Sequence, residues 1–195
     1  IRTIWYEWLL MQRRHGENAM IDVIRKATEE DLSAIMDLLE KGRRRMRQEG
    51  NMEQWPTGNP SKEMVHEDIA KGRSYLAIEE GHIVGTFCLL ETPEPNYAQI
   101  LGAWRNDEAY LTLHRVAADP AVHGLARAMF AFAEKRAREQ GIYNLRIDTH
   151  KMNQGMQRVI RKAGFVHCGV IHLADGAPRE AFQKIVKNEP RETEK

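Results

Sequence analysis

Residues 111–127 constrain the fold of this chain more than any other segment. Alternating apolar residues over 110–117 predict a β-strand, a short loop with Gly124 follows, and a helix over 126–140 begins at once and ends before Gly141. The first turn of a helix leaves backbone N–H groups unpaired, and small residues there let an anion approach the backbone. The segment therefore predicts either a phosphate-binding turn or an ordinary tight turn packed with small side chains.

The remaining sequence supplies short strands and helices in a mixed order. Hydrophobic periodicity predicts strands over residues 21–25, 73–79, 83–90, 144–149, 165–173 and 179–185. It predicts further helices: one that begins at a capping box formed by Thr28 and Asp31, one over 61–71 and one over 156–162. Loops are predicted over 49–61 and 91–107. Because helices lie between strands and hairpins also occur, we expect an α/β (α+β) fold with a mixed sheet covered by helices.

The length of 195 residues favours one domain. A regular globular pattern begins near Met20, so we expect the domain to span residues 20–186. Residues 1–19 are interpreted as an extension or an expression remnant that the domain does not need for folding, and 187–195 as a charged tail.

Composition excludes several classes of function. A formal net charge of +1 gives no reason to expect nucleic acid or an anionic membrane as a partner. No apolar run approaches the ~18 residues of a membrane span. The two cysteines, Cys88 and Cys168, lie in apolar runs and predict buried free thiols, which fits a cytoplasmic protein. We expect no metal site, and the sequence leaves a homodimer open.

Three motifs in the predicted order resemble the GNAT acetyltransferase family. Residues 121–126 resemble its acyl-CoA signature, Gln/Arg-x-x-Gly-x-Gly/Ala. Asn153 and the helix that closes on Lys162-Ala163-Gly164-Phe165 resemble the family's second motif, and Ile83-Val84-Gly85 resembles its hydrophobic-Val-Gly strand. The resemblance implies a twisted, mostly antiparallel sheet with helices on both faces, splayed between the fourth and fifth strands.

The resemblance also implies a function. GNAT enzymes transfer the acetyl group of acetyl-CoA to a primary amine, on a small molecule or a protein, by direct attack in a ternary complex. Backbone groups of three residues at the end of the fourth strand would bind the pantetheine arm: Val116, Ala117 and Ala118. Six residues would cradle the pyrophosphate: Val122, His123, Gly124, Leu125, Ala126 and Arg127. Asn153 would contact the cofactor, cap the following helix, or do both.

Two departures from the family pattern leave an alternative function open. Ala121 stands where a Gln or Arg is usual, and Ile160 stands where many members carry a Tyr that protonates the departing thiolate. The alternative is therefore a non-catalytic regulatory domain that binds CoA or acetyl-CoA. A nucleotide-binding module is a third interpretation, but the loop lacks the Gly-Lys-Ser/Thr of a P-loop.

Candidate catalytic residues lie on the strand over 110–117. Alternation predicts that Tyr110, Thr112, His114 and Val116 share one face, which in the family looks into the cleft where a Glu base often sits. No acidic residue occurs between Tyr110 and Ala118, so Tyr110 and His114 become the candidate catalytic residues. His114 has the intrinsic pKa range of a base, and its alternative is a structural role in the sheet. His150 is the second candidate base.

The acceptor site is expected in the loop over 49–61. In related members this loop lines the acceptor pocket, and here it carries Gln54 and Trp55. Trp55 fits two roles equally well: a wall of the substrate pocket, or a plug in the core or in a lid.

Overall fold

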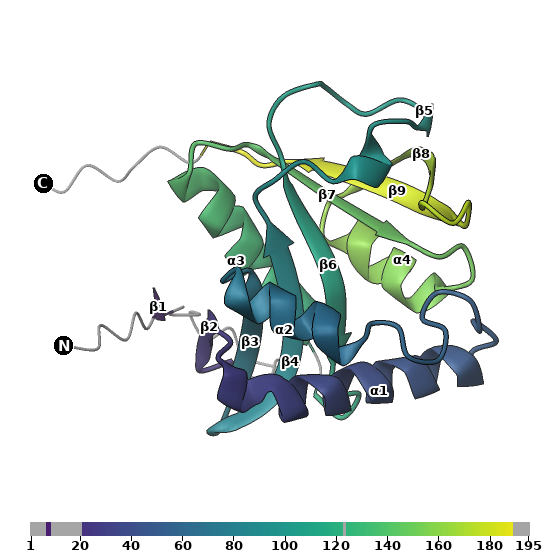
Figure 1. Cartoon of the computed structure of the whole chain (residues 1–195). Coiled ribbons are helices and arrows are strands. Elements are labelled where there is room, and N and C mark those ends of the chain that lie inside the picture. The colour runs from purple at the N-terminus through teal and green to yellow at the C-terminus, as the bar shows by residue number, and fades with distance from the viewer. Residues whose placement is uncertain (1–6, 9–20, 123, 189–195) are drawn as a thin grey trace, which may run out of the picture.

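A computed structural model describes residues 7–8, 21–122 and 124–188. They form one nine-stranded sheet in the order β1-β2-β3-β4-β6-β7-β9-β8-β5 (Figure 1). The strands are β1 (Glu7–Trp8), β2 (Val23–Lys26), β3 (Ser74–Glu79), β4 (His82–Leu90), β5 (Leu101–Gly102), β6 (Leu111–Ala118), β7 (Asn144–Thr149), β8 (Val166–His172) and β9 (Pro178–Ile185). Every neighbouring pair is antiparallel except β6 and β7.

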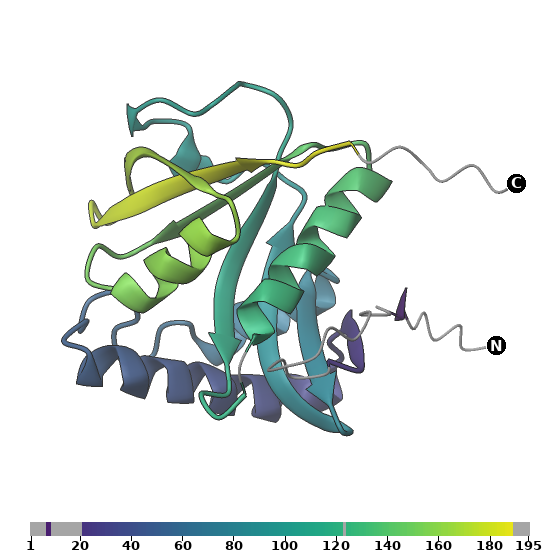
Figure 2. The same ribbon diagram turned by 180° about the vertical axis from the view of Figure 1, so that it is seen from behind.

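Helices cover both faces of this sheet. They are α1 (Leu32–Gln48), α2 (Lys62–Ala70), α3 (Leu125–Glu139) and α4 (Gln154–Lys162), with short 3-10 turns η1 (Glu29–Asp31) and η2 (Pro95–Tyr97). Figure 1 shows α1 and α2 in front of the sheet, and the reverse view in Figure 2 shows α3 and α4 in front. The predicted mixed, mostly antiparallel sheet with helices on both faces is confirmed.

The parallel strands β6 and β7 part after a short contact. They pair at Leu111–Leu145, Thr112–Arg146 and Leu113–Ile147, and no β7 residue pairs with β6 beyond that point. The edge of β6 from His114 to Ala118 therefore faces a gap. Because β6 and β7 correspond to the fourth and fifth strands predicted from the sequence, this gap is the predicted splay.

A β-bulge interrupts the alternation of β6. Cys88 of β4 pairs with His114 and Thr86 pairs with Ala117, so β6 contains one residue more than β4 over this stretch. Arg115 at the bulge has a φ of 51°. The extra residue reverses the alternation, so Val116 packs on the core beneath α3, whereas Ala117 packs on the core beneath α1. The prediction that Val116 shares the face of His114 is therefore wrong.

A buried ion cluster holds this bulge. The Asp68 carboxylate on α2 is fully buried and accepts hydrogen bonds from Arg115 Nε and Nη2 at 2.6 and 2.8 Å, and from Arg73 Nε at 2.6 Å. The Cys88 thiol donates to the same carboxylate. Burial would raise the pKa of Asp68, but the Arg115 charge and these hydrogen bonds lower it overall.

Met129 of α3 packs directly on one motif glycine. A Cβ atom built at Gly85 would lie 2.1 Å from Cε of Met129, so a side chain there would force the end of this flexible Met to move. Met129 is fully buried in the core that α3 and α4 form with the sheet. Cys88 and Cys168 are both buried free thiols, as predicted.

The structure differs from expectation mainly outside the periodic segments. Residues 91–107, predicted as a loop, contain η2 and the two-residue strand β5, which pairs with β8. Such elements are too short to show a hydrophobic periodicity.

Within residues 1–19, β1 pairs with β2 at the sheet edge. His123 and residues 189–195 lie outside the described residues. No helix in the described part is long and apolar enough to span a membrane.

Candidate active site

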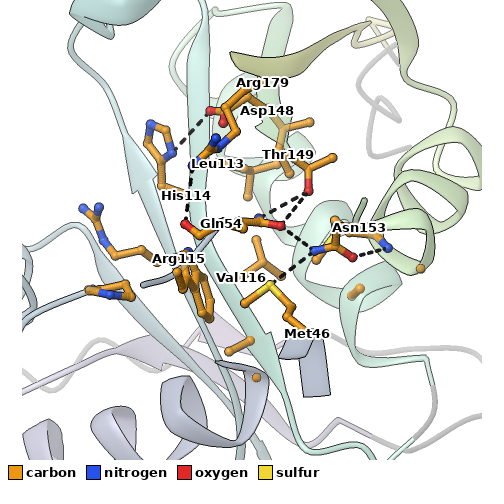
Figure 3. Close-up of a pocket in the computed structure, with 18 of the residues that line it drawn as sticks. Met46, Gln54, Leu113, His114, Arg115, Val116, Asp148, Thr149, Asn153 and Arg179 are labelled. Carbon is orange, nitrogen blue, oxygen red and sulfur yellow. Dashed lines mark hydrogen bonds and ion pairs between the residues drawn. The ribbon is translucent and has the colours of Figure 1, made fainter. Parts of the chain in front are cut away.

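A cleft of about 490 Å³ lies where β6 and β7 part. Its walls come from α1, the loop after α1, the end of β6, the end of β7 and the first turn of α4. The first turn of α3 reaches it through Ala126, and β9 reaches it through Arg179. Figure 3 shows that polar side chains from these elements converge on the gap. The splay of the sheet therefore produces the cleft.

His114 on β6 lies between two carboxylates at the cleft. Its Nε2 is 3.0 Å from Oε2 of Glu94, and its Nδ1 is 3.8 Å from Oδ1 of Asp148. All three side chains are largely buried and line the cleft. The hydrogen bond with His114 lowers the pKa of Glu94 to about 2, so Glu94 is ionised at neutral pH.

Aromatic side chains hold the two carboxylates in place. Tyr97 is buried and its hydroxyl donates to Oδ1 of Asp148 at 2.7 Å. Tyr110 stacks on Tyr97, and its hydroxyl oxygen accepts a hydrogen bond from the Glu94 backbone N–H at 3.2 Å. Tyr110 itself does not line the cleft. The structure therefore places Tyr110 behind the His114 cluster, where it contacts Glu94.

This arrangement is suited to proton transfer. With Glu94 ionised, neutral His114 donates its Nε2 proton to that carboxylate, which leaves the Nδ1 lone pair free. If Nδ1 then takes a proton, the imidazolium lies between two carboxylates. Glu94 and Asp148 were both missed in the sequence, because they are 20 positions before and 34 positions after His114 and only the fold brings them together.

The loop before α3 is held in a defined shape. Gly124 caps the helix with a φ of 83°. The Asp119 carboxylate accepts a hydrogen bond from the Ala121 N–H at 3.0 Å and pairs with Lys41 at 2.9 Å. Ala126 lines the cleft beside Ala117 and Ala118, so the positive end of the α3 dipole lies at the cleft.

Asn153 and Gln54, predicted for different ligands, contact each other. The Asn153 side chain caps α4 by accepting from the Met156 N–H at 3.0 Å, and its Nδ2 donates to Oε1 of Gln54 at 2.9 Å. Gln54 also donates to the Thr149 hydroxyl at 3.3 Å. Asn153 therefore caps the helix, and Gln54 links the loop after α1 to the end of β7 and the start of α4.

Trp55 lies along α1 beside the cleft. A Cβ atom at Gly42 would be 3.2 Å from the Trp55 ring, so the absence of a side chain at Gly42 admits the indole. The ring lines the cleft and packs on the core beneath α1.

His150, the second candidate base, lies outside the cleft lining. It is buried, and its Nδ1 accepts a hydrogen bond from the Met152 N–H at 3.3 Å. Its Nε2 is 3.3 Å from a carboxylate oxygen of Glu53, but forms no hydrogen bond with the described residues. Burial and the charge of Arg179 lower its pKa. The structure thus brings His114, and not His150, together with carboxylates that line the cleft.

A family model and a solved structure assign the chain to the same family. Residues 17–165 match the model of the acetyltransferase (GNAT) family. A GNAT-family acetyltransferase structure from Streptococcus agalactiae is 31% identical, with 85% of this chain and 95% of that chain covered and a TM-score of 0.75. A Listeria monocytogenes GNAT acetyltransferase is 22% identical, covering 83% and 93%, with a TM-score of 0.63.

A ribosomal-protein-alanine N-acetyltransferase from Brucella melitensis has the same fold at 21% identity, covering 83% of this chain and 98% of that chain, with a TM-score of 0.58. A comparison with curated proteins found no match.

Proposed function

This chain belongs to the acetyltransferase (GNAT) family, and we propose that it transfers the acetyl group of acetyl-CoA to a primary amine of a small molecule or a protein. Acetyl-CoA is the co-substrate of the family. The observation that carries the proposal is the position of His114 between Glu94 and Asp148, where β6 and β7 part. The amine attacks directly, in a ternary complex. The two buried free thiols favour a reducing, cytoplasmic location.

The splayed edge of β6 is the proposed cofactor site. Beyond Leu113 this edge has no strand partner on the β7 side, so backbone groups of Val116, Ala117 and Ala118 are available to the pantetheine arm. The pyrophosphate would bind residues 122–127 at the N-terminus of α3, where unpaired N–H groups and the helix dipole favour an anion. Asn153, at the opposite wall, would contact the same cofactor.

In the proposed mechanism His114 is the general base. An alkylamine has a pKa near ~10.4 and arrives protonated, so it must lose a proton before it attacks. His114 Nδ1 takes this proton while Nε2 stays hydrogen-bonded to Glu94. The amine nitrogen then bonds to the thioester carbonyl carbon and the C–S bond breaks. The proton on His114 passes to the departing thiolate, and the nitrogen of the new amide releases its second proton to water.

The remaining predicted residues receive supporting roles. Gln54 and Trp55 would form the wall of the acceptor end, because they line the cleft on the α1 side. Tyr110 would position Glu94 through its hydroxyl. Ile160 is fully buried in the core, so the position where relatives carry a Tyr supplies no acid here. This keeps a CoA-binding domain without turnover as the alternative.

Thiol release from acetyl-CoA, measured with a panel of amines, tests the proposal. We expect turnover in the wild type and a loss of at least ~10²-fold in kcat/KM for His114→Ala, the lower end for a general base. The His150→Ala variant serves as the comparison. CoA binding without turnover on any amine would instead support the regulatory alternative.

A further inference from the structure

Three arginines are buried in the described part of the chain, and two of them have an evident partner. Arg43 is 8% exposed and pairs with Glu40. Arg146 is 4% exposed and lies between two aromatic rings, 4.1 Å from the centroid of Trp104 and 3.9 Å from that of Tyr110. Each guanidinium is thus compensated by a carboxylate or by aromatic faces.

Arg179, which is 6% exposed, has neither kind of partner among the described residues. Its Nη1 donates to the Pro178 carbonyl at 2.9 Å, and its Nη2 donates to the Gln54 carbonyl at 3.5 Å. Arg179 therefore forms no direct ion pair with a carboxylate among the described residues. A buried guanidinium without a hydrogen-bonded counter-charge is costly, which points to an anionic ligand that completes the site.

Arg179 lies at the acceptor end of the cleft, close to the His114 cluster. It lines the cleft, and Figure 3 shows it near Asp148 and above Gln54. Ala181 pairs with Asp148 across β9 and β7, and Arg179 lies two residues along β9 on the same face. A diagonal neighbour of this kind is about 7–8 Å away between Cα atoms. The cleft therefore presents a cation beside two carboxylates.

We propose that the acceptor is a small molecule that carries both an amine and a carboxylate, as an amino acid does. Arg179 binds the carboxylate, while Glu94 and Asp148 attract the ammonium group and hold it at His114. The planar guanidinium can bind a carboxylate through two parallel hydrogen bonds, which fixes the orientation of the acceptor. This inference rests on the proposed acetyl transfer and narrows its acceptor class.

Matched pairs of amines test the inference. The panel contains glycine, β-alanine, 4-aminobutyrate, 6-aminohexanoate and the common L-amino acids, each beside its carboxamide. We expect kcat/KM to favour the best acid over its amide by at least ~100-fold, because the amide leaves Arg179 unpaired. The glycine-to-aminohexanoate series varies the separation of the two groups and shows which spacing fits.

Substitutions at Arg179 test whether this side chain causes the preference for acids over amides. The Arg179→Gln variant should lose at least ~100-fold in kcat/KM on the best acid and change little on its amide, and Arg179→Lys should recover part of the loss. Arg44→Gln is the matched control, because Arg44 is exposed on α1 and does not line the cleft. CoA-induced thermal shifts of each variant report on folding and on the cofactor site.

The outcomes separate this inference from the proposed function. Equal turnover of acids and amides by the wild type, or an equal loss on both in Arg179→Gln, overturns the carboxylate site and leaves acetyl transfer intact. Acetylation of simple amines or lysine peptides in preference to the acids also overturns it. If no amine of either kind is acetylated while CoA binds, the proposed function fails, and this inference fails with it.

Discussion

Replacing Asp68 with asparagine tests the ion cluster that supports the splayed edge of β6. The substitution keeps the shape of the side chain and removes its charge. In the wild type the fully buried carboxylate accepts two hydrogen bonds from Arg115 and one from Arg73. Arg115 also adopts an uncommon φ of 51°, which the rest of the structure must stabilise.

The contacts allow an estimate of the loss. Removing one partner of a buried ion pair typically costs about 3–5 kcal/mol, because the other charge stays buried without compensation. In a domain of this size each kcal/mol shifts the melting temperature by about 2–4 °C. We therefore expect Asp68→Asn to melt about 6–20 °C lower at neutral pH. Glu67→Gln, at the adjacent position of α2, removes an exposed pair with Lys71 and a longer contact with Arg73 at 4.0 Å, and should leave the melting temperature nearly unchanged.

The pH dependence follows from the direction of the pKa shift. The pKa of Asp68 is lowered in the folded protein, so its stabilising contribution is present above the ordinary carboxyl value near ~3.9 and is lost as the pH falls through the folded-state value. Calorimetry of both proteins from neutral to acid pH should show a gap that narrows below about pH 4. Equal melting temperatures at pH 7, or a gap that stays constant into acid, would refute the reasoning.

Three further predictions concern the cleft and the core. Ala126→Glu should abolish the CoA-induced thermal shift, because the new carboxylate lies beside the proposed pyrophosphate site; Ala131→Glu on the same helix is the control. Glu94→Gln should lower kcat/KM at least ~10-fold with CoA binding retained, because it removes the charged acceptor of His114; an unchanged rate would refute this role. Burial raises the pKa of the Cys88 thiol to about 12, so a chromogenic disulfide reagent should label Cys88 only after denaturation, as mass spectrometry of the labelled protein can determine.

Local pattern in the sequence predicted most of the secondary structure and the family. The strand over 144–149 has the same bounds in the structure, and α3 begins one residue before its predicted start. Thr28 and Asp31 form the predicted capping box. These features depend on residues close together in the chain, and periodicity and capping record such short-range preferences directly.

Tertiary structure alone decided the composition of the site. The bulge at Arg115 arises from the pairing of β6 with β4 and from Asp68 on α2, and it reverses the face of Val116. Glu94 and Asp148 reach His114 from different elements. Single-sequence patterns cannot predict such contacts, because strand register and the parting of β6 and β7 depend on packing across the whole sheet.

The lack of an ion-pair partner for Arg179 is likewise a property of the fold. In the sequence it is one of many arginines. It is distinguished only by its burial at the cleft without a directly bonded carboxylate or a stacked ring among the described residues. The sequence by itself therefore determined the fold class and the family, through local periodicity and motif order. The tertiary structure decided which charges meet in the cleft, because burial and long-range pairing determine where a charge is costly without a partner.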